Sequence, residues 1–185
     1  PYFYGQEANG IYSGLSFIYI TVFTMIGTSI GYVLFPMLSK KEKINIKKLR
    51  FYAALGIIGL FTLFTIFGDS INSIAFKGKF DIYRSFKVDL MIILIGVFQF
   101  INGLLHWFIL GLGSIKNITD YLKIIVGVLI IYFFSTIYIT SYNLEDFFVI
   151  IPIVLTAWIF KVLLTIIYIK RTKLFDNYST NKNAV

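Results

Sequence analysis

Two titratable side chains lie deep inside long apolar stretches of this chain, where a charge is costly. Lys161 precedes Lys170 by about nine residues, roughly 13 Å of helix, and His106, the only histidine, is roughly 9 Å from the end of its own stretch. An intramembrane cation normally faces a cavity or a partner, so Lys161 could attract a phosphate-bearing substrate. The alternative is that its long side chain extends to the nearest lipid headgroups. His106 could carry a switchable proton or hydrogen-bond sugar hydroxyls.

A stripe of small and amide residues shares one helix face with His106. At 100° per residue its members fall within about a third of the helix circumference. They are Gly96, Gln99, Asn102, Gly103 and His106. Small residues let helices approach closely and amides hydrogen-bond across the contact, so one interpretation is a packing seam between helices. The other is that the stripe lines a hydrophilic cavity.

The face of Lys161 carries two further residues that could contact a substrate. Trp158 and Thr165 lie on it, which would suit a surface that stacks against sugars and hydrogen-bonds them. A milder stripe in the first apolar stretch is better explained by packing. Its members are Ser13, Ser16, Thr24, Gly27, Thr28 and Gly31. The candidates for a substrate path are Lys161, His106, Gln99, Asn102 and Trp158.

No catalytic set can be assembled from the other polar residues. The acidic residues lie at helix ends or joints, and none are paired within an apolar stretch: Asp69, Asp81, Asp89, Asp120, Glu145 and Asp146. No nucleotide-binding loop and no nucleophile with a base is visible. The chain has no cysteine and a single histidine, so neither a disulfide nor a metal site is expected. The sequence predicts a protein that is not an enzyme and carries no cofactor.

Five apolar stretches must position the candidate residues. They cover residues 11–38, 49–68, 88–112, 119–140 and 145–169. About 20 apolar residues span the hydrocarbon core, and lipid tolerates only backbones whose polar groups are paired, so each stretch is a predicted transmembrane helix. We expect an all-α integral membrane bundle over residues 1–175. Within it, residues 69–87 are an expected interfacial outer segment, and residues 176–185 an expected disordered cytoplasmic tail.

Composition agrees with a membrane protein and argues against a nucleic-acid partner. The chain is 58% hydrophobic with a mean hydropathy of +0.82. Its 14% of charged residues is well below the roughly 25% of soluble domains. The net charge of +8 could indicate a nucleic-acid ligand. However, the cations gather in the joints and the tail, where juxtamembrane lysines belong, so the expected partner is the lipid bilayer.

The distribution of these cations predicts the orientation, because short loops rich in Lys and Arg stay in the cytoplasm. Twelve cations share one side, namely Lys40, Lys41, Lys43, Lys47, Lys48, Arg50, Lys116, Lys123, Lys170, Arg171, Lys173 and Lys182. The other side holds four, namely Lys77, Lys79, Arg84 and Lys87. We therefore expect the N-terminus of the chain outside and its C-terminus in the cytoplasm. An odd number of spans that begins outside leads us to expect a fragment with at least one further span upstream.

Three short segments resemble elements of a known transporter family. Residues 5–13, Gly-Gln-Glu-Ala-Asn-Gly-Ile-Tyr-Ser, are similar to its pattern of Gly, an acid, Gly and an aromatic that opens an outside-to-inside helix. Residues 35–39, Phe-Pro-Met-Leu-Ser, are similar to the Pro-x-Leu-Ser element that ends this helix. Residues 74–80 resemble an outer segment that usually reads Leu-Leu-Phe-Gly, which Lys77 interrupts here. The chain thus resembles the C-terminal half of a Wzx-type oligosaccharide flippase of the MOP exporter superfamily.

The resemblance implies a MATE-like transporter of roughly twelve helices in two bundles around a central cavity, with these five helices near its C-terminus. The implied activity moves an undecaprenyl-diphosphate-linked oligosaccharide across the bacterial cytoplasmic (inner) membrane, for the biosynthesis of surface polysaccharides such as the O-antigen of lipopolysaccharide. H+ or Na+ is the implied coupling ion. No family motif identifies Lys161 as a cavity cation, so its role stays a spatial hypothesis.

Three alternatives remain open at this point. The first is a sibling of the same superfamily, either a peptidoglycan-precursor flippase or a cation-coupled drug antiporter. The second is a membrane-embedded enzyme of glycan assembly, which would need a large outer loop or a set of His and carboxylate residues. The third is a structural or assembly subunit without a transport role.

Overall fold

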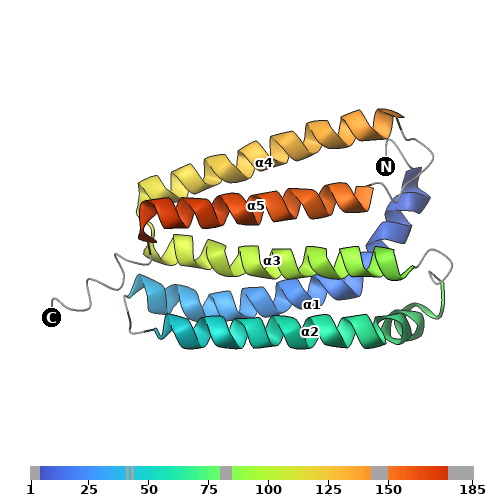
Figure 1. The fold of residues 1–185 in the computed structure, drawn as a ribbon, viewed down its shortest axis with the longest axis horizontal. Helices are drawn as coiled ribbons and strands as arrows, with labels where there is room; N and C mark the ends of the chain where they lie inside the picture. The colour runs from blue at the N-terminus through green and yellow to red at the C-terminus, as the bar shows by residue number, and fades with distance from the viewer. Residues whose placement is uncertain (1–4, 41, 43, 80–84, 143–149, 175–185) are drawn as a thin grey trace.

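The computed structural model describes residues 5–40, 42, 44–79, 85–142 and 150–174. All regular structure in these residues is helical, in the order α1 (Gly5–Ser39), α2 (Ile46–Phe76), α3 (Phe86–Leu112), α4 (Ile115–Tyr142) and α5 (Ile150–Thr172). Successive helices alternate in direction, so α1, α3 and α5 end where α2 and α4 begin (Figure 1). The described part of the chain is an up-and-down helical bundle, as the apolar pattern predicts.

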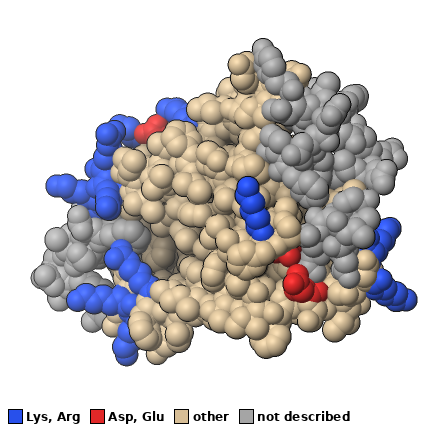
Figure 2. All heavy atoms as spheres, turned by 45° about the vertical axis from the view of Figure 1, so that its right-hand side comes forward, with Lys and Arg blue, Asp and Glu red and all other residues tan. Residues whose placement is uncertain are grey.

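Each of these helices is long and apolar enough to cross a membrane. The most apolar windows have mean hydropathies between 1.7 and 2.4. Even the shortest helix, α5 with 23 residues, is about 35 Å long, which exceeds a hydrocarbon core of about 30 Å. Charged side chains gather toward the ends of the visible face, and most of its middle is uncharged (Figure 2). The protein is therefore a multi-pass membrane protein.

The end of α2 differs from the sequence prediction. A separate interfacial segment is predicted from residue 69, but α2 continues to Phe76. One polar residue of this region, Asn72, lies inside the bundle and is only 3% exposed, whereas Asp69 and Ser70 are exposed. The helix ends where Lys77 adopts a left-handed backbone with φ 52° and its N–H bonds the Ser73 carbonyl, a common helix C-terminus. Residues 80–84 and the predicted tail at 176–185 lie outside the described residues.

Helices α1 and α3 pack by an exchange of glycines and large side chains. On α3, Gly96 receives the ring of Phe23, and a Cβ at this glycine would lie 2.5 Å from Phe23 Cδ2. In the other direction, Gly31 of α1 receives the indole of Trp107, which would overlap any Cβ placed there. Helices in lipid gain little from hydrophobic association, so close van der Waals packing of this kind is what joins them.

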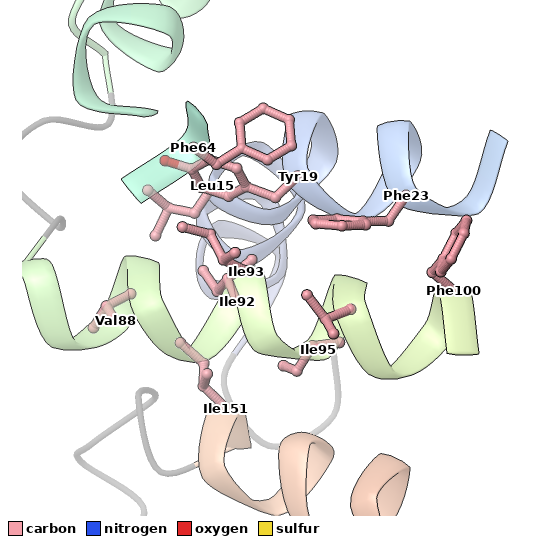
Figure 3. Close-up of a cluster of buried hydrophobic side chains, with 11 residues drawn as sticks. Leu15, Tyr19, Phe23, Phe64, Val88, Ile92, Ile93, Ile95, Phe100 and Ile151 are labelled. Atoms are coloured by element: carbon pink, nitrogen blue, oxygen red, sulfur yellow. The ribbon is translucent and has the colours of Figure 1, made fainter. Parts of the chain in front are cut away.

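An aromatic cluster attaches α2 to the same pair. The Tyr19 and Phe64 rings meet edge to face with centroids 5.1 Å apart, and the Phe23 and Phe64 centroids are 5.8 Å apart. All three side chains are buried, and Figure 3 shows them beside Ile93 of α3, with Ile151 reaching the same helix from α5. Because α3 contacts each of the other four described helices, it is the centre of the bundle.

Replacing Gly96 by alanine is expected to destabilise the folded bundle by about 1–3 kcal/mol, because the added methyl group overlaps the buried Phe23 ring. Gly103→Ala is the matched control on the same helix, since nothing lies within 4 Å of a Cβ at Gly103 and alanine is the better helix former. Thermal unfolding of the purified protein in detergent, followed by circular dichroism, compares the two variants. Equal transition midpoints would contradict the close contact between α1 and α3.

Candidate functional site

The first part of the polar stripe on α3 serves the contact with α1. Gly96 receives Phe23, as described above, and Gln99 Oε1 accepts a 3.0 Å hydrogen bond from Thr24 Oγ1 of α1. Thr24 is exposed and Gln99 half-buried, so this pair lies at the rim of the contact. Gly96 and Gln99 therefore belong to the packing contact between α1 and α3, although Gln99 remains accessible from one side.

Asn102 and Gly103 have very different surroundings although they are neighbours in sequence. Asn102 is 8% exposed, and its Oδ1 makes no hydrogen bond to any described residue. A buried acceptor without a partner costs about 1–3 kcal/mol, so water or a ligand hydroxyl at this atom would be stabilising. Gly103 has open space where its side chain would be. The structure thus combines an unsatisfied amide with adjacent room on the same helix.

His106 lies where α3 meets α4 and α5. Its ring centroid is 5.6 Å from that of Tyr121 on α4. Tyr121 is fully buried, and its hydroxyl lies near Thr165 of α5 but makes no hydrogen bond of ordinary geometry to a described residue. Thr165 is also fully buried and donates its hydroxyl to the backbone carbonyl of Lys161 at 2.8 Å. Three helices therefore bring polar side chains to one place inside the bundle.

Lys161 stands at the midpoint of α5 (Ile150–Thr172), with eleven residues of the helix on each side of it. That is roughly 16 Å of helix in each direction. Its Nζ lies 4.6 Å from the centroid of the Trp158 ring, which is one turn nearer the start of α5 and thus farther from the basic end at Lys170. The ammonium group is directed toward the start of α5, away from the basic end at Lys170. Extension to the headgroups at that basic end is not the conformation of this side chain.

The contact with Trp158 does not offset the whole cost of this position. A lysine at the centre of a membrane helix costs about 2.5–3.5 kcal/mol on insertion scales. A cation–π contact contributes about 0.5–2 kcal/mol. In the part of the chain that the structure describes, no carboxylate acts on Lys161, whose positive charge acts on the imidazole of His106. Water or an anion beside the ammonium group would supply the missing stabilisation.

These residues form what we call the polar junction, which comprises His106, Tyr121, Trp158, Lys161 and Thr165. Of the candidates predicted from sequence, the structure brings His106, Trp158 and Lys161 to the junction and leaves Gln99 in the contact with α1. Tyr121 is not predicted, because the neighbouring Asp120 and Lys123, whose side chains pair at 2.9 Å, make this turn of α4 look like a solvated joint. A tyrosine on the opposite face of that turn is the one signal that could have identified it.

The polar junction offers donors, an acceptor and an aromatic face. Its ammonium and hydroxyl groups can donate hydrogen bonds to phosphate or sugar oxygens, and the indole can stack against a sugar ring. Among the described residues no group of three or more His, Cys, Asp or Glu side chains could hold a metal ion. Compared with protein-family models, curated proteins and solved structures, the chain matches none of them. Conclusions on function therefore depend on the geometry itself.

A cysteine introduced at Gly103 is expected to react with a small, charged, membrane-impermeant thiol reagent, because the position is sterically open and the predicted hydrophilic path runs along this face of α3. The chain has no other cysteine, and the full-length protein without the substitution measures labelling from any other part of the molecule. Ile130→Cys is the matched control, since Ile130 is 52% exposed on the apolar surface of α4 and would face lipid. Labelling is measured by a mass shift in membranes that contain the full-length protein. An unreactive Gly103→Cys variant would contradict a water-filled cavity beside α3.

Proposed function

We propose that this multi-pass membrane protein is part of a transporter that moves a lipid-linked oligosaccharide across the membrane, as a Wzx-type flippase of the MOP superfamily does. The observation that carries the proposal is the mid-span position of Lys161, with Trp158 beside it and no carboxylate partner among the described residues. An uncompensated cation at this depth is expected to mark the path of an anionic substrate. The diphosphate of a polyprenyl-linked glycan has this charge.

The chemistry of such a substrate matches the polar groups around the path. The diphosphate would accept hydrogen bonds from the Lys161 ammonium group and nearby hydroxyls, which are stronger for charged partners. Sugar rings would stack on Trp158 and hydrogen-bond Gln99 and Asn102. The polyprenyl tail would stay in the bilayer. Transport would proceed by alternating access, in which two helical bundles rock around a substrate held near the bilayer midplane, with H+ or Na+ as coupling ion.

The sibling alternatives fit less well or predict a different phenotype. A cation-coupled drug antiporter needs an acidic site for its cationic cargo. Among the described carboxylates, Asp89 and Asp120 lie in the first two turns of α3 and α4, and Asp69 lies seven residues before the end of α2, so none of these three is at mid-span. A peptidoglycan-precursor flippase would carry the same diphosphate chemistry, but its loss would stop growth. Loss of a surface-glycan flippase would leave growth intact and deplete the surface glycan.

Lys161→Gln is expected to reduce surface glycan display at least tenfold in cells whose own copy is deleted, because the amide cannot neutralise a diphosphate. Lys161→Arg keeps the charge and is expected to retain a substantial part of the activity. Lys116→Gln removes an equal charge from an exposed position at the start of α4 and is expected to behave like the unsubstituted protein.

The readouts for these variants are quantitative blotting of surface glycan and of protein in the membrane fraction. A second readout is the amount of undecaprenyl-diphosphate-linked oligosaccharide, which should accumulate when flipping fails. Normal display by a stably inserted Lys161→Gln variant would refute the assigned role. Cell lysis without glycan loss would favour the peptidoglycan-precursor flippase.

Trp158 provides an independent test of the same path. Trp158→Phe keeps an aromatic face for the ammonium group and for a sugar, and is expected to lower the glycan export rate only a few-fold. Trp158→Leu keeps a hydrophobic side chain but has no π face, and is expected to lower the rate about tenfold, in line with the loss of about 1.4 kcal/mol of cation–π and stacking energy. Equal rates for the two variants, at equal protein level, would argue against an aromatic contact with the substrate.

A further inference from the structure

A groove separate from the polar junction runs along α3 between α2 and α5. Its volume is about 430 Å³, and its lining is apolar except for Arg50 of α2 and Lys170 of α5. Nine residues at 100° each place Lys170 on the face of α5 opposite Lys161. The groove therefore opens on the far side of α5 from the mid-span lysine, and its two cations belong to a different site.

Both cations lie at one end of the groove. Arg50 is near the start of α2 and Lys170 near the end of α5, and these helix ends share one end of the bundle (Figure 1). From there the apolar lining continues toward the middle of the membrane, with Ile57 seven residues, or roughly 10 Å, beyond Arg50. The small side chains of Ala53 and Ala54 give this stretch its width. The groove thus has a cationic mouth at headgroup depth and an apolar slot behind it.

We propose that this groove binds one acidic phospholipid of the adjoining leaflet, with its phosphate between Arg50 and Lys170 and one acyl chain in the apolar slot. A guanidinium group binds two phosphate oxygens in parallel, and an ammonium group adds a third charged donor. A zwitterionic lipid would bring its own cation beside these two, which opposes binding. The charge at the mouth therefore selects an anionic amphiphile.

The surrounding surface strengthens this selection. Basic residues cluster at the same end of the bundle, including Lys47 near the start of α2 and Lys173 just after α5. Juxtamembrane clusters of this kind attract acidic lipids to the membrane surface around them. The cluster would raise the local concentration of acidic lipid, while Arg50 and Lys170 would hold one molecule in a defined place. This site does not depend on the proposed transport activity, and its tests measure lipid binding alone.

The first experiment titrates the purified full-length protein with phosphatidylglycerol and counts bound lipid by native mass spectrometry. Arg50→Gln with Lys170→Gln is expected to weaken binding about 25-fold, as two factors of roughly five, one for each cation removed. The matched control, Lys47→Gln with Lys173→Gln, removes the same charge from the same end but leaves the lining of the groove intact. It is expected to weaken binding far less. Equal loss in the two double variants, or equal affinity of the unsubstituted protein for phosphatidylcholine with the same chains, would overturn the proposal.

The second experiment locates the acyl chain. Phosphatidylglycerol with a photoreactive group in its acyl chain is incorporated into vesicles that contain the full-length protein. Crosslinks are expected on the α2 peptide around Ala54 and Ile57, and Ala54→Phe, which fills the slot and keeps both cations, is expected to abolish them. Crosslinks that spread evenly over the apolar surface of α4 would overturn the proposal. So would an α2 peptide that stays unlabelled, because another segment of the protein would then occupy the slot.

Discussion

Close contact between α1 and α3 determines where the other helices can lie. Across this contact, glycines of each helix face large side chains of the other. A third such pair is Gly27 of α1 and Phe100 of α3, where a Cβ added at Gly27 would lie 3.3 Å from the Phe100 ring. In lipid, such packing replaces the hydrophobic drive that holds soluble bundles together. Once α1 and α3 are joined, Phe64 brings α2 against their common surface, and Ile151 brings α5 against α3. This packing determines where the candidate residues on α3 lie.

The positive charges of the bundle lie in two different environments. Arg50 and Lys170 lie near helix ends, where a cation is solvated and is attracted to acidic headgroups. Lys161 lies at mid-span, where a cation is costly and where the neighbouring Trp158 supplies only part of the compensation. A residue kept at a cost of this kind needs a polar partner in some state of the protein. The separation of the two sites by α5 allows one to hold a structural lipid while the other is accessible to a moving substrate.

The sequence was sufficient to predict the five helices because lipid restricts the backbone to so few structures. It did not predict that residues 69–76 continue α2, since the periodicity of that stretch does not show that the bundle buries Asn72. The polar stripe of α3 could be placed on one helix face, but a helix face can contact two neighbours, and only the fold separates Gln99 beside α1 from His106 beside α4. Tyr121 reaches the polar junction through tertiary packing, and the local pattern shows only that it lies on the opposite face of its turn from Asp120 and Lys123.

The interlocking of α1 and α3 also limits how the bundle can change shape. If the two helices shifted by one turn, the Phe23 ring would leave Gly96 and collide with the side chain of Ile92 or Phe100. A ratchet-like slide is therefore blocked, and the pair must move as one rigid body. Helix α4, whose most apolar window is only 6% buried, is attached mainly through α5 and has no such interlock. Opening and closing of the bundle would then move α4 and α5 relative to the rigid α1–α3 pair.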